Sequence, residues 1–298
     1  MDAGIYFGRP SQLRRLYDPF GGMLATIDIG SSVFVSGDGS GTNISKALGG
    51  ARTYTLNYGV LGRANFEFLN AFQLGHMGTG PFVLLDPGRR NLLTGNQSSA
   101  TSLTNDTRGF TVSGAGGSIS SDSSLTTLFP RSLKWSFATA TPASASLLLD
   151  KPSSVWPGIP VTARPYTFWF WVLGGTGAIN FQLTLKWMSL TGSTLSTSTS
   201  ATYTSSTSNW LLAKLSVVSV PVGAVWVQPG IAPDVSTIGS GEALYINSLQ
   251  LNEGDGPDAS WAPGTGVYPV QMLTLPERYG FAEPGMLVSP TLTLQELR

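Results

Sequence analysis

The chain has 298 residues, of which 41% are hydrophobic and only 11% charged, against about 25% charged in a typical soluble domain. Basic and acidic residues number 17 each, and this zero net charge, with no long Lys/Arg run, excludes a binding surface for nucleic acid or for an anionic membrane. Cysteine is absent, so disulfides and thiolate chemistry are excluded and folding in a reducing cytoplasm is expected. The length predicts about two domains, and the shortage of charge predicts a surface partly covered by neighbouring subunits.

No secretory signal is expected, because the first residues lack a basic region followed by an apolar stretch. The longest apolar run, residues 166–173, is far shorter than the ~20 residues that a membrane helix needs. A protein without membrane contact is therefore predicted.

Short runs of strand-forming residues, separated by Gly and Pro, predict a mostly β protein with antiparallel strands. The expected strands cover residues 25–29, 32–35, 51–58, 82–85, 133–137, 166–172, 180–187, 210–218, 224–228, 243–251 and 291–297. In the strand at 51–58, Tyr54, Leu56 and Tyr58 alternate with polar residues, which is typical of a half-buried strand.

One segment has a convincing helical pattern. Phe66, Leu69 and Phe72 recur at helical spacing within residues 62–74, and glycines follow. We expect this helix, through those three side chains, to build contacts between subunits. A second, short helical turn is predicted at residues 11–16, where Ser11 is a suitable cap.

Two breaks in composition divide the chain. Residues 1–90 carry fourteen charged residues, whereas 91–262 carry fifteen in almost twice the length and are rich in Ser, Thr and Gly. Residues 263–298 are too short to fold alone, yet end in an alternating strand that needs a sheet to join. We therefore predict a first domain made of 1–90 and 263–298, with 91–262 inserted as a second β-sandwich.

Residues 193–209 contain thirteen Ser or Thr among seventeen residues. Such low complexity is typical of a mobile loop. Threonine is a good strand former, however, and Gly192 is suited to a turn, so an exposed hairpin or sheet edge is the preferred interpretation.

Catalytic chemistry has little support. His76 is the single histidine and follows the predicted helix in a turn-like context, with no Gly-x-Ser-x-Gly motif in the chain. The acidic residues of 91–262 lie mostly beside Gly, Pro or Ser, as turn residues do, although a pair facing each other across a cleft stays open as an alternative. We expect no enzyme activity, no catalytic residue and no cofactor.

One polar segment offers candidate ligands for a calcium ion. The candidate oxygen ligands are Asn247, Asn252, Glu253, Asp255 and Asp258. Their spacing does not match an EF-hand, so an ordinary polar loop is favoured over a structural calcium site, and no metal is assigned.

Tryptophans concentrate in residues 91–262, where indole faces suit both sandwich cores and sugar stacking. Core packing is expected to take most of them, because both faces of the strand at 168–172 are apolar. Four remain as candidate glycan contacts: Trp156, Trp169, Trp171 and Trp210.

Several motifs of the inserted domain resemble carbohydrate-binding-module-like jelly rolls. These are residues 90–94, 166–172, 183–187, 221–224 and 243–254, with Trp210 opening a strand. The resemblance implies a β-sandwich with a possible saccharide ligand. Members of that family usually carry Asp, often a ligand of structural calcium, where this chain has Asn247.

The remainder resembles minor or distal tail proteins of siphophages that infect actinobacteria. The resemblance lies in residues 2–9, 52–58, 80–87 and 291–297, together with the helix after Gly62. It implies a tail-tube-like β-sandwich that forms a ring, with six subunits, at the tip of the virion tail. Implied partners are the tail tube, hub and tape-measure proteins, and host cell-wall saccharide. The protein would be made in the host cytoplasm.

Three alternatives stay open. A receptor-binding tail protein would have saccharide binding as its main function, a decorated major tail tube subunit would differ in copy number, and a glycan-degrading tail enzyme would turn over cell-wall polysaccharide.

Overall fold

The structure is a computed structural model. It describes residues 5–16, 19, 23–27, 31–35, 41–45, 51–59, 61–86, 90–114, 117–140, 144–151, 154–254, 261–275, 279–282, 285–288 and 290–297. No helix among these residues is long and apolar enough to span a membrane. The predicted mostly β fold is confirmed, with antiparallel pairing throughout the named sheets.

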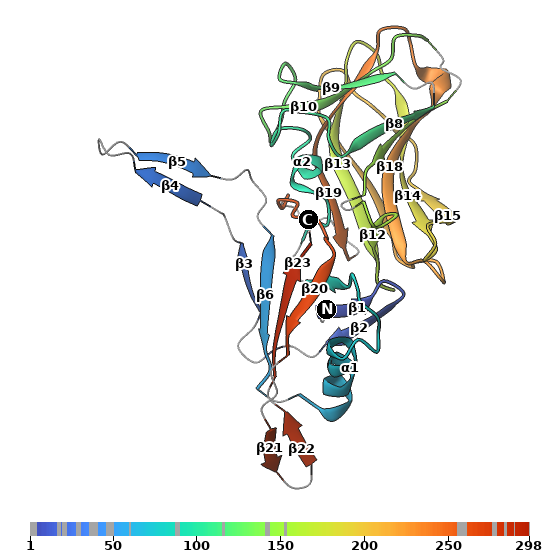
Figure 1. Ribbon diagram of the computed structural model, residues 1–298. Helices are drawn as coiled ribbons and strands as arrows, with labels where there is room; N and C mark the ends of the chain where they lie inside the picture. The colour runs from blue at the N-terminus through green and yellow to red at the C-terminus, as the bar shows by residue number, and fades with distance from the viewer. Residues whose placement is uncertain are drawn as a thin grey trace. The chain divides into compact units, whose positions relative to one another are not determined.

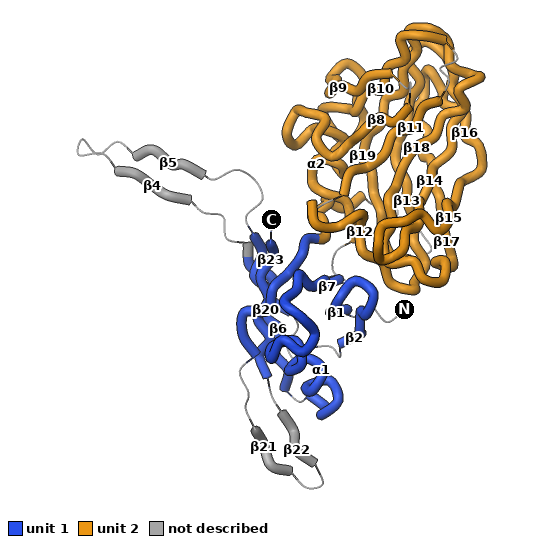
Figure 2. The backbone as a smooth tube through the Cα atoms, turned by 45° about the vertical axis from the view of Figure 1, so that its right-hand side comes forward, with its two compact units in different colours: residues 1–86, 268–298 blue, residues 87–267 orange. Residues whose placement is uncertain are grey.

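The chain folds into two compact units (Figure 2). Unit 1 comprises Met1–Asp86 and Tyr268–Arg298, and unit 2 comprises Pro87–Val267. The predicted boundaries, after residues 90 and 262, lie a few residues from these divisions.

Unit 1 contains two sheets that are linked through one bridge. The first has the order β2-β1-β7 and the second β20-β23-β6-β3. Phe82, beside β7, and Val270, in β20, form an antiparallel bridge with backbone N···O distances of 2.9 and 2.8 Å. The strands are β1 (Ile5–Arg9), β2 (Gln12–Leu16), β3 (Met23–Ile27), β6 (Arg52–Asn57), β7 (Val83–Leu85), β20 (Val270–Thr274) and β23 (Thr291–Glu296), with the separate hairpins β4 (Ser31–Val35) and β5 (Gly41–Ser45), and β21 (Tyr279–Ala282) and β22 (Gly285–Val288).

The predicted helix is confirmed as α1 (Arg63–Gln73), but its expected role in subunit contacts is wrong. Phe66, Leu69 and Phe72 are buried in the core of unit 1. The Phe72 ring lies 5.0 Å from that of Phe7 and 4.8 Å from that of Phe82, measured between ring centroids. Because the apolar stripe of this amphipathic helix is used to close its own unit, it is not free to contact a neighbour.

The short helix predicted at residues 11–16 is also wrong, because this segment is the strand β2. It pairs with β1 in a tight hairpin in which Arg9 is opposite Gln12. The hairpin depends on Gly8, whose φ is 146° and whose missing Cβ would lie 2.4 Å from the Gln12 carbonyl oxygen. A glycine at this position therefore selects the strand over the helical turn.

The C-terminal strand completes unit 1, since β23 lies between β20 and β6. Its buried Glu296 accepts a hydrogen bond from the Tyr54 hydroxyl, at 2.7 Å, and one from the Arg52 backbone N–H, at 3.3 Å. These bonds, with the ladder that pairs Leu292 with Leu56, fix the last strand to β6.

Unit 2 is a sandwich of two antiparallel sheets (Figure 1). One has five strands in the order β17-β13-β19-β10-β9, and the other has β15-β14-β18-β11-β8 with β12 and β16 attached. The strands are β8 (Phe110–Gly114), β9 (Ser118–Asp122), β10 (Ser132–Ser136), β11 (Ala145–Leu149), β12 (Ile159–Pro160), β13 (Tyr166–Gly174), β14 (Asn180–Met188), β15 (Thr194–Thr199), β16 (Tyr203–Thr204), β17 (Leu211–Val217), β18 (Trp226–Pro233) and β19 (Ala243–Glu253); the short helices are α2 (Gly95–Ser98) and η1 (Val235–Thr237).

Large side chains fill the space between the two sheets. Phe170 of β13 meets Phe181 of β14 at a ring-centroid distance of 6.1 Å, and Tyr166 meets Trp187 at 6.0 Å. All four are buried. Burial of the Tyr166 hydroxyl raises the pKa of this phenol, so it stays neutral.

The Ser/Thr-rich segment is an exposed sheet edge, as predicted. Gly192, with φ of 84°, turns β14 into β15, and β15 is the last strand of its sheet. Five of its six side chains are exposed. The segment is thus stabilised by pairing with β14 rather than by a core of its own.

Candidate functional site

The face of the five-stranded sheet that points away from the sandwich core carries an unusual set of side chains. Along β13, Phe168 and Phe170 point into the core, so Trp169 and Trp171 take the opposite side. We call this surface the outer face. The residues used below are Trp169 and Trp171 (β13), Leu212 and Lys214 (β17), Tyr245 and Gln250 (β19), Lys134 (β10) and Asp122 (β9), with Trp210 preceding β17.

Cross-strand register brings an aromatic and an aliphatic side chain together near the sheet edge. Trp171 is directly opposite Leu212 on β17, the edge strand. Leu212 is 36% exposed and Trp171 is half-buried. Side chains so placed have Cβ atoms about 4.5–5.5 Å apart, so the pair forms one apolar area.

Two residues along the same pair of strands, the outer face becomes polar. Trp169 is opposite Lys214 on β17 and Gln250 on β19. The Tyr203 hydroxyl fixes the backbone of Lys214, accepting from its N–H at 3.1 Å and donating to its carbonyl at 2.9 Å. The edge strand is thereby held in place at the residue that carries the positive charge.

A second apolar group lies on the same face. Leu173, Ala243 and Tyr245 form a small cluster against which Leu125 and Trp210 pack. Beside this cluster the Lys134 ammonium lies 5.4 Å from the centre of the Tyr245 ring and 3.7 Å from the Asp122 carboxylate.

The charges of Lys134 and Asp122 largely neutralise each other. A hydrogen bond to Tyr245 raises the pKa of Lys134, and the nearby Asp122 adds to that effect. Burial acts to raise the pKa of Asp122, but hydrogen bonds from Ser124 and the charge of Lys134 lower it overall. Both groups are therefore charged at neutral pH and compensate each other.

The four predicted glycan-contact tryptophans differ in their placement. Trp156 and Trp169 are only 3% exposed, so neither offers a free ring face for sugar stacking. Trp156 packs against Trp226, with ring centroids 5.5 Å apart. Trp171 and Trp210 are half-buried on the outer face and remain candidates.

Other residues of this face were missed from the sequence. Leu212 and Lys214 alternate along β17 like the side chains of any half-buried strand, and Lys134 has ordinary strand neighbours. Only the cross-strand register brings them to the tryptophans, and no local motif encodes that register.

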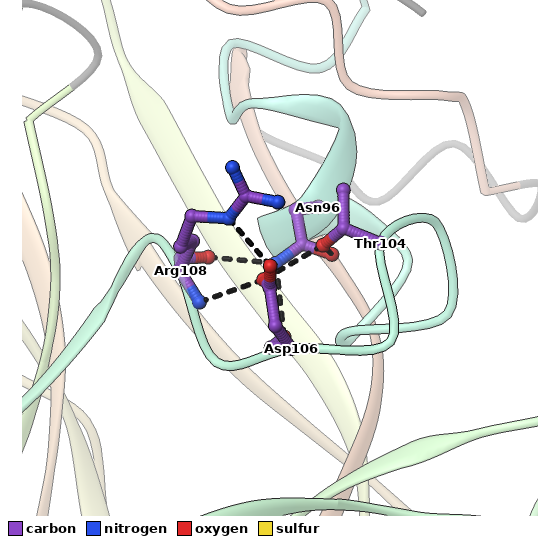
Figure 3. A network of polar contacts seen from close by, with 4 residues as sticks. All are labelled: Asn96, Thr104, Asp106 and Arg108. Atoms are coloured by element: carbon purple, nitrogen blue, oxygen red, sulfur yellow. Dashed lines mark hydrogen bonds and ion pairs between the residues drawn. The ribbon is translucent and has the colours of Figure 1, made fainter. Parts of the chain in front are cut away.

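Buried side-chain amides organise the loops at one end of unit 2 (Figure 3). The Asn96 amide nitrogen donates to the Arg108 carbonyl, at 2.7 Å, and its oxygen accepts from the Thr104 hydroxyl, at 2.7 Å. Arg108 also pairs with Asp106, with 2.5 Å between Nε and Oδ2. A hydrogen bond from Thr104 is the largest cause that lowers the pKa of Asp106, and Arg108 acts in the same direction.

Two further amides extend this arrangement. The Gln97 amide nitrogen donates to the carbonyls of Gly109 and Asp150, both at 2.8 Å. That of Asn91 donates to the carbonyls of Leu249 and Ala262, both at 2.9 Å. Neutral side chains thus connect separate segments of unit 2 through hydrogen bonds to backbone carbonyl groups.

Asn247 is the first of the candidate calcium ligands named from the sequence. Its amide nitrogen donates to the Arg131 carbonyl at 2.8 Å and to the Ser132 hydroxyl at 3.1 Å, and the Phe129 carbonyl lies 3.5 Å away. An –NH₂ group here points at three oxygen atoms, which is the placement a cation would need. The donor set therefore does not fit calcium, because the amide itself fills the positive role.

The other calcium candidates do not form a site in the described structure. Glu253 accepts from the Thr162 hydroxyl and pairs with Arg164, with 3.7 Å between Oε2 and Nη1. Asp255 and Asp258 lie outside the described residues. Within the described part of the chain, no group of three or more His, Asp and Glu residues could hold a metal ion. His76 is exposed in the turn after α1.

No known protein family and no curated protein matches the sequence. Among solved structures, the chain is similar to the carbohydrate-binding module TmCBM61 in complex with β-1,4-galactotriose (15% identity, TM-score 0.40, covering 55% of this chain and 99% of that one). It is similar to the CBM22-1 xylan-binding domain of Xyn10C from Paenibacillus barcinonensis (12% identity, TM-score 0.36, covering 51% of this chain and 90% of that one). It is also similar to the enzymatically active domain of tailspike protein 4 from bacteriophage CBA120 (14% identity, TM-score 0.38, covering 55% of this chain and 21% of that one).

Proposed function

We propose that unit 2 binds saccharides on its outer face, and that the protein is a non-enzymatic component of a phage tail that presents this face to host-surface glycans. The proposal rests on one observation, the cross-strand pair of Trp171 and Leu212 with Lys214 two residues further along the same edge strand. A sugar ring needs an apolar surface for its C–H face and polar partners for its hydroxyl groups. This surface offers both.

The binding experiment uses the full chain. Titration with β-1,4-galactotriose and with a xylan oligosaccharide, followed by tryptophan fluorescence and calorimetry, should give saturable binding. Trp171→Ala should weaken the affinity about tenfold, because an aromatic contact contributes about 0.5–1.5 kcal/mol beyond its buried area. Leu212→Ala should weaken it less.

Leu195→Ala is the matched control for Leu212→Ala. Leu195 is 46% exposed but lies on β15, in the other sheet. Its substitution should leave the affinity unchanged. Binding that is insensitive to Trp171 and Leu212 but lost with Leu195→Ala would refute this location of the site. Release of shorter sugars during the titration would instead indicate the enzyme alternative.

A ring-forming role for unit 1 is the second proposed function, and it rests on β3, which pairs on one side only among the described strands. β3 ends its sheet, and its exposed Leu24, Ala25 and Thr26 carry no charge. Edge strands that stay unpaired are usually protected by charge or by a covering segment. β2, at the other end of the linked sheets, carries the charges of Arg14 and Arg15. The guanidinium carbon of Arg14 lies 5.1 Å from the centre of the Phe68 ring.

A neighbouring subunit that adds a strand to β3 through a heterologous contact forms a ring when the rotation between subunits closes. We propose six subunits, at the tip of the virion tail, with tube, hub and tape-measure proteins as the adjoining partners. This replaces the subunit contacts expected from α1.

The oligomeric state tests this second role. Multi-angle scattering and negative-stain images of the full chain should show rings, and Leu24→Lys should dissociate them. Leu74→Lys is the control, because Leu74 is similarly exposed but follows α1. Rings that survive Leu24→Lys would exclude β3 as the contact.

A further inference from the structure

Trp169 contains a buried hydrogen-bond donor that has no acceptor among the described residues. Its side chain is 3% exposed, and the indole Nε1 has no hydrogen-bond partner there. Leaving a buried donor unpaired costs about 1–3 kcal/mol. Since native proteins satisfy nearly all such groups, this one calls for an explanation.

A lysine without an ion-pair partner among the described residues lies on the neighbouring strand. Lys214 lies directly across from Trp169 on β17. Lys134, on the same face, is by contrast paired with Asp122. No carboxylate of the described residues lies within ion-pair distance, 4.0 Å, of the Lys214 ammonium. Among the described residues, this cross-strand pair therefore carries one cation without a carboxylate partner and one N–H donor without an acceptor.

Two such donors match the oxygen atoms of an anion. Carboxylate and phosphate oxygens accept strong, charge-assisted hydrogen bonds from ammonium and N–H groups. Trp171 and Leu212 lie one step along the same strands and supply the apolar surface that a sugar ring requires. A neutral sugar would use that surface but leave Lys214 uncompensated.

We propose that the outer face selects an anionic saccharide, whose carboxylate or phosphodiester oxygens are bound between the Trp169 indole N–H and the Lys214 ammonium. This proposal rests on saccharide binding by the same face. Because Nε1 is covered in the unliganded protein, a covering side chain must move on binding. Of the two cross-strand neighbours, Lys214 is the one on the edge strand with a long, flexible stem.

Matched ligands isolate the contribution of the acid. The full chain is titrated with an oligogalacturonate, with the same oligosaccharide as its methyl ester, and with a glycerol-phosphate oligomer. The free acid should bind at least tenfold more tightly than the ester, and added salt should reduce that difference. Tight binding of either anion supports the shared chemistry, and the tighter of the two identifies its source.

Two substitutions test the assigned groups. Trp169→Phe removes the N–H but keeps an aromatic ring, and Lys214→Gln removes the charge but keeps a polar chain. Each should reduce the preference for acid over ester about tenfold, because the affinity for the acid falls much more than the affinity for the ester. Lys186→Gln is the control, because Lys186 lies on β14 in the other sheet and should not alter the preference.

The outcomes separate this inference from the function on which it rests. Equal binding of acid and ester refutes the anion preference but leaves saccharide binding intact. Absence of binding to every saccharide refutes both. A preference for the acid that survives Trp169→Phe and Lys214→Gln, in variants whose thermal unfolding shows a folded unit 2, also refutes the assignment.

Discussion

Asn247→Asp replaces one buried amide nitrogen of β19 by an oxygen atom. The wild-type amide donates to the Arg131 carbonyl and the Ser132 hydroxyl, and it is completely buried. An ionised carboxylate of the same shape cannot donate. We therefore expect two lost hydrogen bonds, at about 1 kcal/mol each, and an unpaired buried charge that costs a few kcal/mol more. The expected total at neutral pH is about 5 kcal/mol.

This loss should depend on pH. A carboxyl group that is buried against carbonyl oxygens has a folded-state pKa above its unfolded value of about 3.9. Below that unfolded value the variant is a neutral acid in both states, and its O–H can still donate. The variant should therefore approach wild-type stability in acid and lose stability as the pH rises through the folded-state pKa.

Urea unfolding followed by tryptophan fluorescence measures the effect, because all eight tryptophans lie in unit 2. Asn209→Asp is the control, since Asn209 is exposed and its substitution should change the free energy of unfolding by less than about 0.5 kcal/mol. Calcium should partly rescue Asn247→Asp, because a carboxylate among carbonyls is a hard-oxygen site. A variant that matches wild type at neutral pH would refute this reasoning.

Three further predictions concern packing. Phe72→Ala should lower the unfolding transition of unit 1 by about 3–5 kcal/mol in calorimetry; dissociation of an oligomer with unit 1 equally stable would contradict its core role. Gly8→Ala should cost at least about 1–3 kcal/mol, because of the strained φ and the close Gln12 carbonyl; an unchanged melting temperature would count against the hairpin geometry. Tyr203→Phe should speed amide exchange at Lys214 and cost about 1–2 kcal/mol; unchanged protection would show that this hydroxyl is dispensable.

Local patterns predicted much of the fold. The spacing of Phe66, Leu69 and Phe72 gave the helix its bounds, because an amphipathic stripe is encoded within a few residues. The same spacing did not say what the stripe packs against. At residues 11–16, Leu13 and Leu16 fit either a helix or a strand, and the backbone of Gly8 decided between them.

The candidate site was less predictable, since it depends on register. In β13 both faces are apolar, so sequence alone could not tell that Trp169 is covered while Trp171 reaches the surface. The register between β13 and β19 also shifts after Trp169. Near this irregularity Ser248 adopts a φ of 56°, which a serine rarely does. No sequence motif signals such a shift.

The entry and exit segments of unit 2 are tied to each other, and this has a consequence for the order of folding. The Gly266 N–H donates to the Leu93 carbonyl at 2.8 Å, and the Asn91 amide nitrogen donates to the Ala262 carbonyl. Unit 2 is continuous, from 87 to 267, whereas unit 1 must pair Leu56 with Leu292. Once unit 2 has folded, it brings the two halves of unit 1 together and removes about 2–3 kcal/mol of loop-closure entropy. During synthesis the inserted unit can therefore act as an intramolecular chaperone for the unit that surrounds it.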